Sequence, residues 1–426
     1  MLKAFTPRAA GFAAAAAAMY VAGRLTGVPE LYMLAVAALA LPLGALAVVT
    51  WGNSRLASSR SVRPVRTSVG NRIAVTVRLD NPTRLETGVL LLEDRLPYQL
   101  GPGARFVVPG IPGGDRELLS YEVRAAARGR YSIGPLAVRL ADPFGLAQVT
   151  SELAGSTDVI VHPRVEALAA PGLGGELASS AATKVRYLFS QGDEFYTTRE
   201  YRDGDDLRKV HWRSSAKRGQ LMIRQDESPR QARVLIALDL RAAVHVGGDE
   251  HSSLERVISA GASIAARLAT GGYEIGCVTD DGGTVRVPRG ADAAGPILDF
   301  LAGAGPSHSP SLAPLAARLT ATSGEGLLVL VTAVPSPEEA AALARTRASF
   351  AGALAILVRT DSWLPPARPG AGARMASEAE AATSAAIARL HRAGWQTVTL
   401  QRGEPLEPVW RNLLRGRGRA PAGGRL

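Results

Sequence analysis

The chain has 426 residues, a net charge of +11 and one cysteine. This length favours about three folded units, and a single cysteine excludes disulfides within the chain and fits a reducing compartment. The basic excess does not indicate a nucleic-acid ligand, because only four of the 49 basic residues are lysine, an arginine bias typical of a GC-rich genome.

Two apolar stretches near the N-terminus predict a transmembrane helical hairpin over residues 1–55. Residues 31–51 contain no charge, and a helix of this length spans about 30 Å, the thickness of the hydrocarbon core. The alanine-rich run at 5–23 is also compatible with the core of a cleaved signal peptide. A second span follows it after a short loop, so we favour the hairpin.

Basic residues set the expected orientation of this hairpin. Lys3 and Arg8 precede it, four arginines follow it within residues 55–66, and only Arg24 lies between the two runs. The positive-inside rule therefore places both ends in the cytoplasm. We expect a protein of the cell (inner) membrane that contacts the lipid bilayer and has cytoplasmic soluble domains.

Residues 56–165 predict a small antiparallel β-sandwich. Short alternating or apolar runs, separated by turn signals, are typical of this class of domain. The expected strands are 73–79, 89–94, 117–125, 129–131, 136–140 and 159–161. Nothing in this domain has the spacing of a catalytic site, so we expect it to act as a spacer or in docking.

The chain changes character again after residue 165. Residues 166–191 are rich in alanine, glycine and serine and are expected to form a linker. From 233 to 414, apolar strands alternate with helices, which predicts a mostly parallel sheet with helices on both faces. The glycine- and arginine-rich residues 415–426 form a basic tail, for which a frayed terminus is favoured over a contact with anionic lipid.

A densely charged segment occupies residues 192–232. Eight acidic and eight basic residues lie within 192–227, and this balance argues against a nucleic-acid tail. Guanidinium groups paired with carboxylates form directional networks. We therefore favour an ordered platform over a solvated surface, in which exposed ion pairs contribute only about 0–1 kcal/mol each.

The order of residues in this segment resembles the signature of the bacterial domain-of-unknown-function family 58. The residues that carry the resemblance are Arg199, Glu200, Tyr201, Gly204, Asp205, Asp206, Arg208, Trp212, Ser215, Lys217 and Gly219. Lys217 stands where the family usually has arginine, and His211 where it often has aspartate. The sequences at 128–131 and 142–146 resemble a second signature of the same family. We expect Arg199, Asp205, Asp206, Arg208 and Trp212 to form the functional core of the motif.

The resemblance implies a von Willebrand factor A-like (Rossmann-type) α/β domain at 233–414 and a partner ATPase of the MoxR AAA+ type. In such domains the first strand ends in D-x-S-x-S, which binds a divalent ion. The corresponding positions here are Asp239, Arg241 and Ala243, so both serines are lost and one is replaced by a cation. We therefore predict no metal at this degenerate position. Arg241 is instead a candidate to accept acidic side chains of a partner at the carboxyl end of the sheet.

Local matches to catalytic motifs carry little weight. Ser214–Lys217 matches the S-x-x-K motif of penicillin-binding proteins, but the partner motifs S-D-N and K-T-G are missing. No phosphate-binding G-x-x-x-x-G-K-[ST] loop is present. His211 is expected to be a structural histidine and Cys277 an inert core residue. The group His245, Asp249, Glu250 and His251 is interpreted as a loop in preference to a zinc site.

Two functions from different classes follow from this sequence. The favoured one is a non-enzymatic, membrane-anchored adaptor or assembly protein that needs no cofactor, binds no nucleic acid and works with a MoxR-type ATPase. The alternative is a metal-assisted or carboxylate-based hydrolase, in which Glu200, Asp205 and Asp206 act near His211. The near-equal number of arginines argues against the hydrolase, because pairing lowers the pKa of carboxyl groups and removes them from acid–base chemistry.

Overall fold

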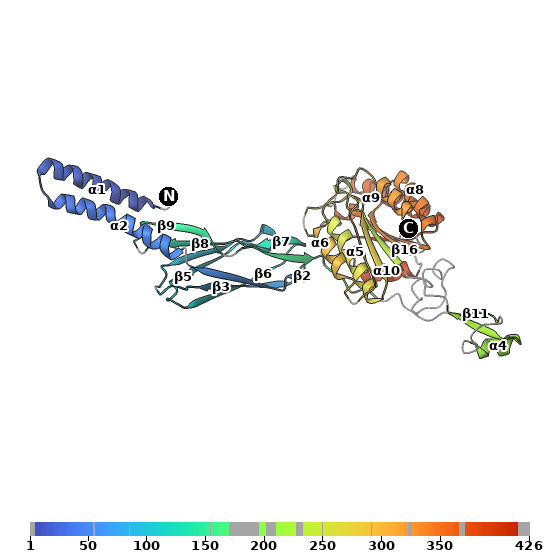
Figure 1. The fold of residues 1–426 in the computed structure, drawn as a ribbon. Helices are drawn as coiled ribbons and strands as arrows, with labels where there is room; N and C mark the ends of the chain where they lie inside the picture. The colour runs from blue at the N-terminus through green and yellow to red at the C-terminus, as the bar shows by residue number, and fades with distance from the viewer. Residues whose placement is uncertain are drawn as a thin grey trace. The chain divides into compact units, whose positions relative to one another are not determined.

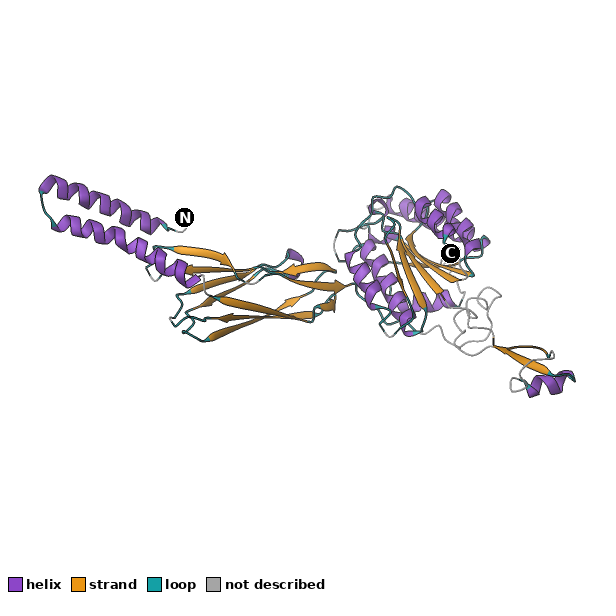
Figure 2. Ribbon diagram, viewed as in Figure 1, coloured by secondary structure: helices purple, strands orange, loops and turns teal. Residues whose placement is uncertain are grey.

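A computed structural model of the chain describes residues 5–53, 56–84, 86–142, 144–153, 155–169, 196–201, 210–226, 233–248, 250–290, 292–322, 326–365 and 371–415. The chain divides into two compact units, Met1–His162 (unit 1) and Pro163–Leu426 (unit 2). Figure 1 labels many of the elements of both units, and Figure 2 distinguishes their helices from their strands.

Unit 1 begins with two antiparallel helices, α1 (Pro7–Thr26) and α2 (Glu30–Asn53), which lie side by side (Figure 1). Both have the length and apolar composition of helices that cross a membrane, as expected. The first span is the less hydrophobic of the two, with a mean hydropathy of 1.2 against 2.3 for the second.

A seam of mostly small residues joins the two helices. The buried positions recur every seven residues, and they are Ala9, Ala16 and Gly23 on α1 and Ala35, Pro42 and Val49 on α2. A seven-residue repeat keeps the contacts on one helix face, and small side chains let two backbones approach closely without a hydrophobic driving force. The alanines that make α1 a weak hydrophobic span thus make it a good packing partner.

The rest of unit 1 is rich in β-sheet, as predicted. Its strands are β1 (Ala57–Arg63), β2 (Arg66–Ser68), β3 (Arg72–Asp80), β4 (Leu90–Asp94), β5 (Ala104–Val108), β6 (Arg116–Arg124), β7 (Gly129–Ile133), β8 (Leu136–Ala141), β9 (Gln148–Glu152) and β10 (Thr157–His162). They form three sheets, with the orders β1-β3-β6, β2-β10-β7 and β5-β4-β8-β9. One buried hydrophobic cluster draws on all three sheets and on Val49 of α2.

Four of these strands, β1, β2, β5 and β9, were not expected from the sequence. The first has the sequence Ala-Ser-Ser-Arg-Ser-Val-Arg, in which Val62 is the only buried apolar residue. Without a run of alternating apolar residues such a segment carries no strand signal. Its pairing with the strongly alternating β3, from Ala57 opposite Asp80 to Arg63 opposite Ala74, determines its conformation.

A buried ion pair connects the three sheets of unit 1. Arg60 on β1 pairs with Asp94 on β4, and their side chains are 2% and 0% exposed. The hydroxyl of Tyr121 on β6 donates to the same carboxylate at 2.7 Å, and Arg60 also donates to the carbonyl oxygen of Ile133 on β7 at 2.9 Å. Gly134 has a positive φ of 108°, and a Cβ at this position would clash with the guanidinium.

Unit 2 contains a six-stranded sheet with the order β15-β14-β13-β16-β17-β18, parallel except for the edge strand β15. Its strands are β13 (Arg233–Leu238), β14 (Glu274–Thr279), β15 (Thr284–Val287), β16 (Gly326–Ala333), β17 (Gly352–Val358) and β18 (Gln396–Leu400). All six lie within residues 233–414, where the sequence predicted strands alternating with helices.

Helices cover both faces of this sheet (Figure 2). Alternate residues of β16 point to opposite sides, with Val329 and Val331 in one buried cluster and Leu328 and Leu330 in another. The first cluster includes α5 (Ser253–Thr270), α6 (Gly295–Gly303) and α10 (Leu406–Leu414). The second includes α7 (Ala313–Ala321), α8 (Pro337–Thr346) and α9 (Ala371–Arg392). Burial on both faces explains the uninterrupted apolar strands.

The first residues of the expected linker are packed against unit 2. The carboxylate of Glu166 pairs with Arg256 of α5 and accepts the backbone N–H of Leu406 at 2.8 Å. Leu168 is buried in the core. Residues 166–169 therefore fix the entry of the chain into unit 2, whereas 170–191 of the expected linker and 416–426 of the basic tail lie outside the described residues.

The ion pair of unit 1 gives a first prediction. Asp94→Ala leaves the buried guanidinium of Arg60 without its counter-charge, so we expect a loss of about 3–5 kcal/mol in the free energy of unfolding. The control Glu122→Ala removes an ion pair with Arg72 whose side chains are 59% and 77% exposed, and we expect it to cost less than about 1 kcal/mol. Pulse proteolysis of the full chain in urea measures both values, and equal losses would contradict the central place given to the ion pair.

Candidate functional site

The degenerate position lies at the carboxyl end of the parallel sheet. The apolar strand β13 ends at Leu238, and the carboxylate of Asp239 follows it, completely buried. Arg241 Nε and Nη2 donate to the two oxygens of this carboxylate at 2.8 and 3.0 Å. Thr332 Oγ1, on the neighbouring strand β16, donates to Asp239 Oδ2 at 2.8 Å. Ala243 lies in the short 3-10 helix Ala242–Val244, is exposed and adds no polar side chain.

Glu339 binds the remaining side of the Arg241 guanidinium. It pairs with Arg241 Nη1 and accepts the backbone N–H of Leu312 at 3.1 Å. Its other oxygen accepts the N–H of Ser336, which forms a capping box at the start of α8. The first turn of α8 thus presents a carboxylate to the end of the central strands, a favourable position for a negative charge.

Arg241 acts as an internal cation at this position. Its side chain is only 3% exposed. Burial alone lowers the pKa of Arg241, but its hydrogen bonds and attraction to Asp239 and Glu339 outweigh burial and raise it. The structure contradicts the expectation that Arg241 receives acidic side chains of a partner, because its three guanidinium nitrogens already bind carboxylates of the same chain.

A second buried carboxylate, Asp280, ties together the loops at this end of the sheet. It follows β14 directly, accepts the N–H of Leu240 at 2.8 Å and accepts a hydrogen bond from the hydroxyl of Ser307. Arg318 donates to its backbone carbonyl oxygen. Asp280 was not among the site residues predicted from the sequence, although its place immediately after a buried strand was a usable signal for this edge of the sheet.

His245 completes the network in its neutral form. Its Nε2 lies 2.9 Å from the carbonyl oxygen of Asp239, which can only accept, so Nε2 carries the proton. Its Nδ1 lies 3.0 Å from Ser253 Oγ, which in turn accepts the N–H of Val246 at 2.9 Å. Burial lowers the pKa of His245 below its usual 6.5. Asp249, from the same expected loop, lies outside the described residues.

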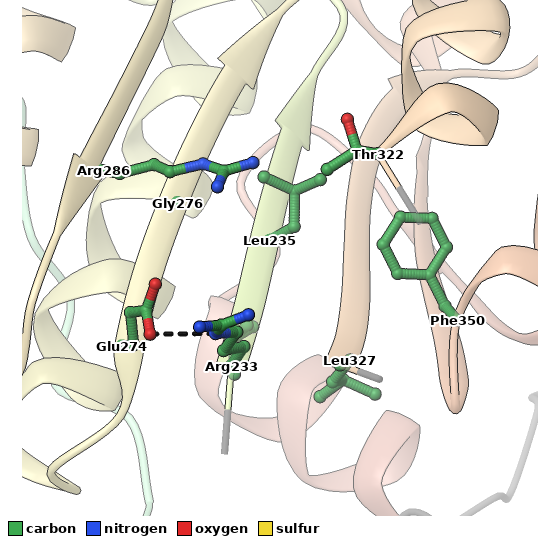
Figure 3. A pocket seen from close by; sticks show the side chains of 10 residues that line it. Arg233, Leu235, Glu274, Gly276, Arg286, Thr322, Leu327 and Phe350 are labelled. Atoms are coloured by element: carbon green, nitrogen blue, oxygen red, sulfur yellow. Dashed lines mark hydrogen bonds and ion pairs between the residues drawn. The ribbon is translucent and has the colours of Figure 1, made fainter. Parts of the chain in front are cut away.

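The opposite end of the sheet holds a small cavity of about 80 Å³ (Figure 3). Its lining includes Leu235, Arg286 and Phe350, and an ion pair of 2.9 Å joins Arg233 to Glu274 at its rim. Binding sites for small molecules usually measure about 300–1,000 Å³. This cavity has room only for a few water molecules, so it offers no ligand site.

The thiol of Cys277 also lacks the features of a reactive group. It lies in β14 within the buried cluster and is 0% exposed. Burial raises its pKa to about 12. The expectation of an inert core residue is confirmed. Among the residues that the structure describes, no three His, Cys, Asp or Glu side chains gather closely enough to hold a metal ion.

The charged segment contains a second candidate site, a small motif that we call the signature hairpin. It consists of β11 (Tyr196–Glu200), α4 (Trp212–Arg218) and β12 (Met222–Asp226), of which β11 and α4 are labelled in Figure 1. The two strands are antiparallel, with Tyr196 opposite Asp226 and Glu200 opposite Met222.

Backbone hydrogen bonds and two side chains hold α4 against this pair of strands. His211 caps the helix, because its Nδ1 accepts the N–H of Ser214 at 3.2 Å and its own N–H donates to Met222 O at 2.8 Å. Ser215 Oγ accepts the N–H of Met222 at 2.9 Å and donates to His211 O at 3.1 Å. Gly219, with a positive φ of 71°, ends the helix. His211 is therefore structural, as expected.

The described signature residues divide into structural and exposed ones. Ser215 and Gly219 maintain the motif, and Glu200 accepts the side-chain N–H of Gln220 at 2.6 Å. Lys217 lies in the exposed last turn of α4. Tyr201 donates its backbone N–H to Leu221 O at 2.9 Å.

Trp212, which was expected in the functional core of the motif, lies at the surface. It is 72% exposed, whereas Val210, Ser215, Met222 and Ile223 are buried, among the residues of the motif whose burial the structure describes. Arg199 is opposite Ile223 in the strand register. The remaining signature residues, Gly204, Asp205, Asp206 and Arg208, lie outside the described residues.

The internal cation gives a second prediction. Arg241→Ala leaves the carboxylates of Asp239 and Glu339, 0% and 13% exposed, without a counter-charge, so we expect unit 2 to lose about 3–5 kcal/mol of stability. Added Mg²⁺ or Mn²⁺ should recover part of this loss, because the vacated space is surrounded by oxygen ligands. The control Arg233→Ala, which removes an exposed ion pair, should cost at most about 1 kcal/mol. Equal losses of stability in the two variants, or an Arg241→Ala variant that neither ion stabilises, would be evidence against an internal cation.

The histidines give a third prediction. Burial lowers the pKa of both His245 and His391, so the unfolded chain binds these protons more readily than the folded one. Stability is then fully present above pH 6.5, the ordinary pKa, and is lost as the pH falls from there toward the lowered values. Urea midpoints between pH 8 and 5 should show this slope, and His245→Gln should reduce it. An unchanged slope in His245→Gln would contradict the contribution of this buried neutral histidine.

Comparison with known proteins finds a distant relative over about half of this chain. The Uncharacterized protein YeaD of Bacillus subtilis (strain 168) is 23% identical over 226 residues, which are 51% of this chain and 54% of that protein. The chain thus spans about half the length of this relative.

Among solved structures, the CARDB domain of the PF1109 protein from Pyrococcus furiosus is 14% identical and matches 25% of this chain and 91% of its own, with a TM-score of 0.20. The putative ApaA protein from Bordetella pertussis is 8% identical with the same two coverages and a TM-score of 0.19. Likenesses at these scores carry no argument about fold or function. The model of the protein family described as Protein of unknown function DUF58 matches residues 197–389, from the signature hairpin into α9.

Proposed function

We propose that this chain is a non-enzymatic, membrane-anchored adaptor that binds its partner through the signature hairpin. The observation that carries the proposal is the exposure of Trp212. An exposed tryptophan is costly in water, whereas tryptophan and arginine are enriched among the residues that dominate binding at protein interfaces.

The surroundings of Trp212 support a binding role. Arg213, Lys217 and Arg218 lie on the same short helix, and Leu221, which follows it, is 41% exposed. The helix is held in place by hydrogen bonds of the hairpin itself, so little flexibility is lost on binding. These features suit a partner surface with an apolar pocket and acidic residues around it.

The chemistry at the carboxyl end of the sheet supports a non-enzymatic role. The carboxylates of Asp239, Glu339 and Asp280 all accept hydrogen bonds from groups of their own chain. His245 is engaged at both ring nitrogens. Acid–base or nucleophilic catalysis needs groups within reach of a substrate, and these groups are committed to the fold.

The architecture proposed for the whole chain follows from the same elements. Two N-terminal spans anchor it in the cell membrane with both soluble domains in the cytoplasm. The β-rich part of unit 1 is a β-sandwich that is antiparallel except for the pairing of β2 with β10. Unit 2 is a von Willebrand factor A-like domain, in which the guanidinium of Arg241 takes the place of the divalent ion. The ion pairs of Arg241 with Asp239 and Glu339 support this last point.

The proposed partner is an AAA+ ATPase of the MoxR type, which the resemblance of the signature segment to its family implies. The charge and exposure of α4 indicate the surface that such a partner would contact. An internal cation makes this interaction independent of metal ions, in contrast to binding through an ion-bridged carboxylate.

Affinity capture from solubilised membranes tests this proposal. We expect Trp212→Ala to weaken capture of the ATPase at least about 30-fold, the effect of losing a residue that contributes about 2 kcal/mol. The control Tyr98→Ala removes another exposed aromatic side chain, 87% exposed in unit 1, and should capture normally. Capture by the wild type should also persist in EDTA.

Two results would refute the proposal. One is undiminished capture by Trp212→Ala, which would exclude the signature hairpin as the docking surface. The other is loss of capture in EDTA, which would show that an ion takes part.

A further inference from the structure

We propose that unit 1 binds an anionic phospholipid in a groove between the two N-terminal helices and the loop that follows β8. This inference rests on the proposed membrane anchor. The groove encloses about 490 Å³. Its walls are Gly11, Phe12 and Ala15 of α1, Leu41 of α2, and Phe144 and Leu146 of the loop, and Arg8 lies at one end.

Hydrogen bonds link described residues of the loop to Asp142 and to the start of α1. The carboxylate of Asp142 accepts the backbone N–H groups of Phe144 and Leu146 at 2.9 and 2.7 Å. Thr6, immediately before α1, donates its N–H to Leu146 O at 3.0 Å and its hydroxyl to Gly145 O at 2.6 Å. The loop therefore lies at the level of the first turn of α1.

This level is the expected boundary between hydrocarbon and water. A span of about 30 Å uses about 20 residues, and α1 comprises 20 residues from Pro7 to Thr26. The first turn of α1 then lies among lipid headgroups. Phe144 is held at this depth with 64% of its surface exposed, and an exposed apolar ring there can insert at the boundary between headgroups and acyl chains.

The charge at the end of the groove matches a lipid phosphate. Among the described residues, no carboxylate lies within ion-pair distance of Arg8. Gly145, with a positive φ of 66°, has no side chain to exclude the Arg8 guanidinium, since a Cβ there would lie 2.9 Å from Nη1. An arginine near a membrane attracts anionic headgroups, and the loop holds this one against the groove.

The apolar walls match the first part of an acyl chain. Phe12 and Leu41 are each 40% exposed. Phe12 lies one turn after Arg8 on α1 and Leu41 lies in the middle of α2, so both are farther than Arg8 from the end of the hairpin where α1 begins. A lipid with its phosphate on Arg8 would place its chain over these two side chains and beside Phe144. A second copy of the chain fits less well, because an apolar helix in the groove would bury Arg8 without a counter-charge.

Thermal unfolding of the full chain in a non-ionic detergent tests the assignment, with phosphatidylglycerol or phosphatidylcholine of identical acyl chains added in parallel. We expect the wild type to bind and be stabilised by phosphatidylglycerol at lower concentration than phosphatidylcholine. Arg8→Gln should weaken the binding of phosphatidylglycerol about fivefold and remove the preference for phosphatidylglycerol over phosphatidylcholine. The matched control Arg24→Gln, at the other end of α1, should behave as the wild type.

A second pair of variants tests the apolar walls. Phe144→Ala should weaken the binding of both lipids equally. Val107→Ala, at a strand residue that is 67% exposed, should leave the binding of both lipids unchanged. A preference for phosphatidylglycerol that persists in Arg8→Gln, or equal behaviour of Phe144→Ala and Val107→Ala, would overturn the assignment.

Carbonate extraction of membranes separates this inference from the proposed anchor. We expect both the wild type and Arg8→Gln to stay in the membrane pellet and only the variant to lose its lipid preference. This result supports the anchor and the groove together. If the wild type is retained but shows no lipid preference, only the groove is refuted. If the wild type is extracted by carbonate, the anchor is refuted, and with it the groove as a lipid site.

Discussion

The structure of unit 2 depends on one buried cation between two carboxylates. Arg241 joins the end of β13, through Asp239, to the first turn of α8, through Glu339. The desolvation cost of such groups is large, and their mutual attraction offsets it only when the geometry is good and the other hydrogen-bonding positions are filled. Both conditions hold here, since Thr332 donates to Asp239 and the N–H of Leu312 to Glu339.

Unit 1 uses arginine in a similar way. Arg60 binds Asp94 and reaches a carbonyl oxygen of a third sheet, so both units join separate elements through a buried guanidinium. Lysine would be a poor substitute, because an ammonium group is a compact point charge, whereas the planar guanidinium can bind several oxygens at fixed angles. In a chain with 49 basic residues, most arginines reflect composition, but these two determine how sheets and helices meet.

The sequence predicted the elements of unit 2 well and the partners of its charged residues poorly. Strands buried on both faces, such as β16 and β17, are long apolar runs that periodicity detects. The strand β1 escaped detection because its conformation comes from pairing with β3. The role of Arg241 was also hidden, because Glu339 is 98 residues away in the chain and Thr332 lies 93 residues from Asp239. Similarly, nothing in the residues around Trp212 indicated that the helix would turn its largest side chain toward solvent.

The burial of Cys277 makes the chain suitable for selective labelling of cysteines introduced at its surface. Its sulfur is enclosed in the sheet and stays protonated at neutral pH, so the native protein gives almost no background with maleimides. A cysteine introduced at any surface position can then be modified selectively without first removing the native one. Membrane-permeant and impermeant reagents, applied to intact cells, would thus report which side of the bilayer each segment faces.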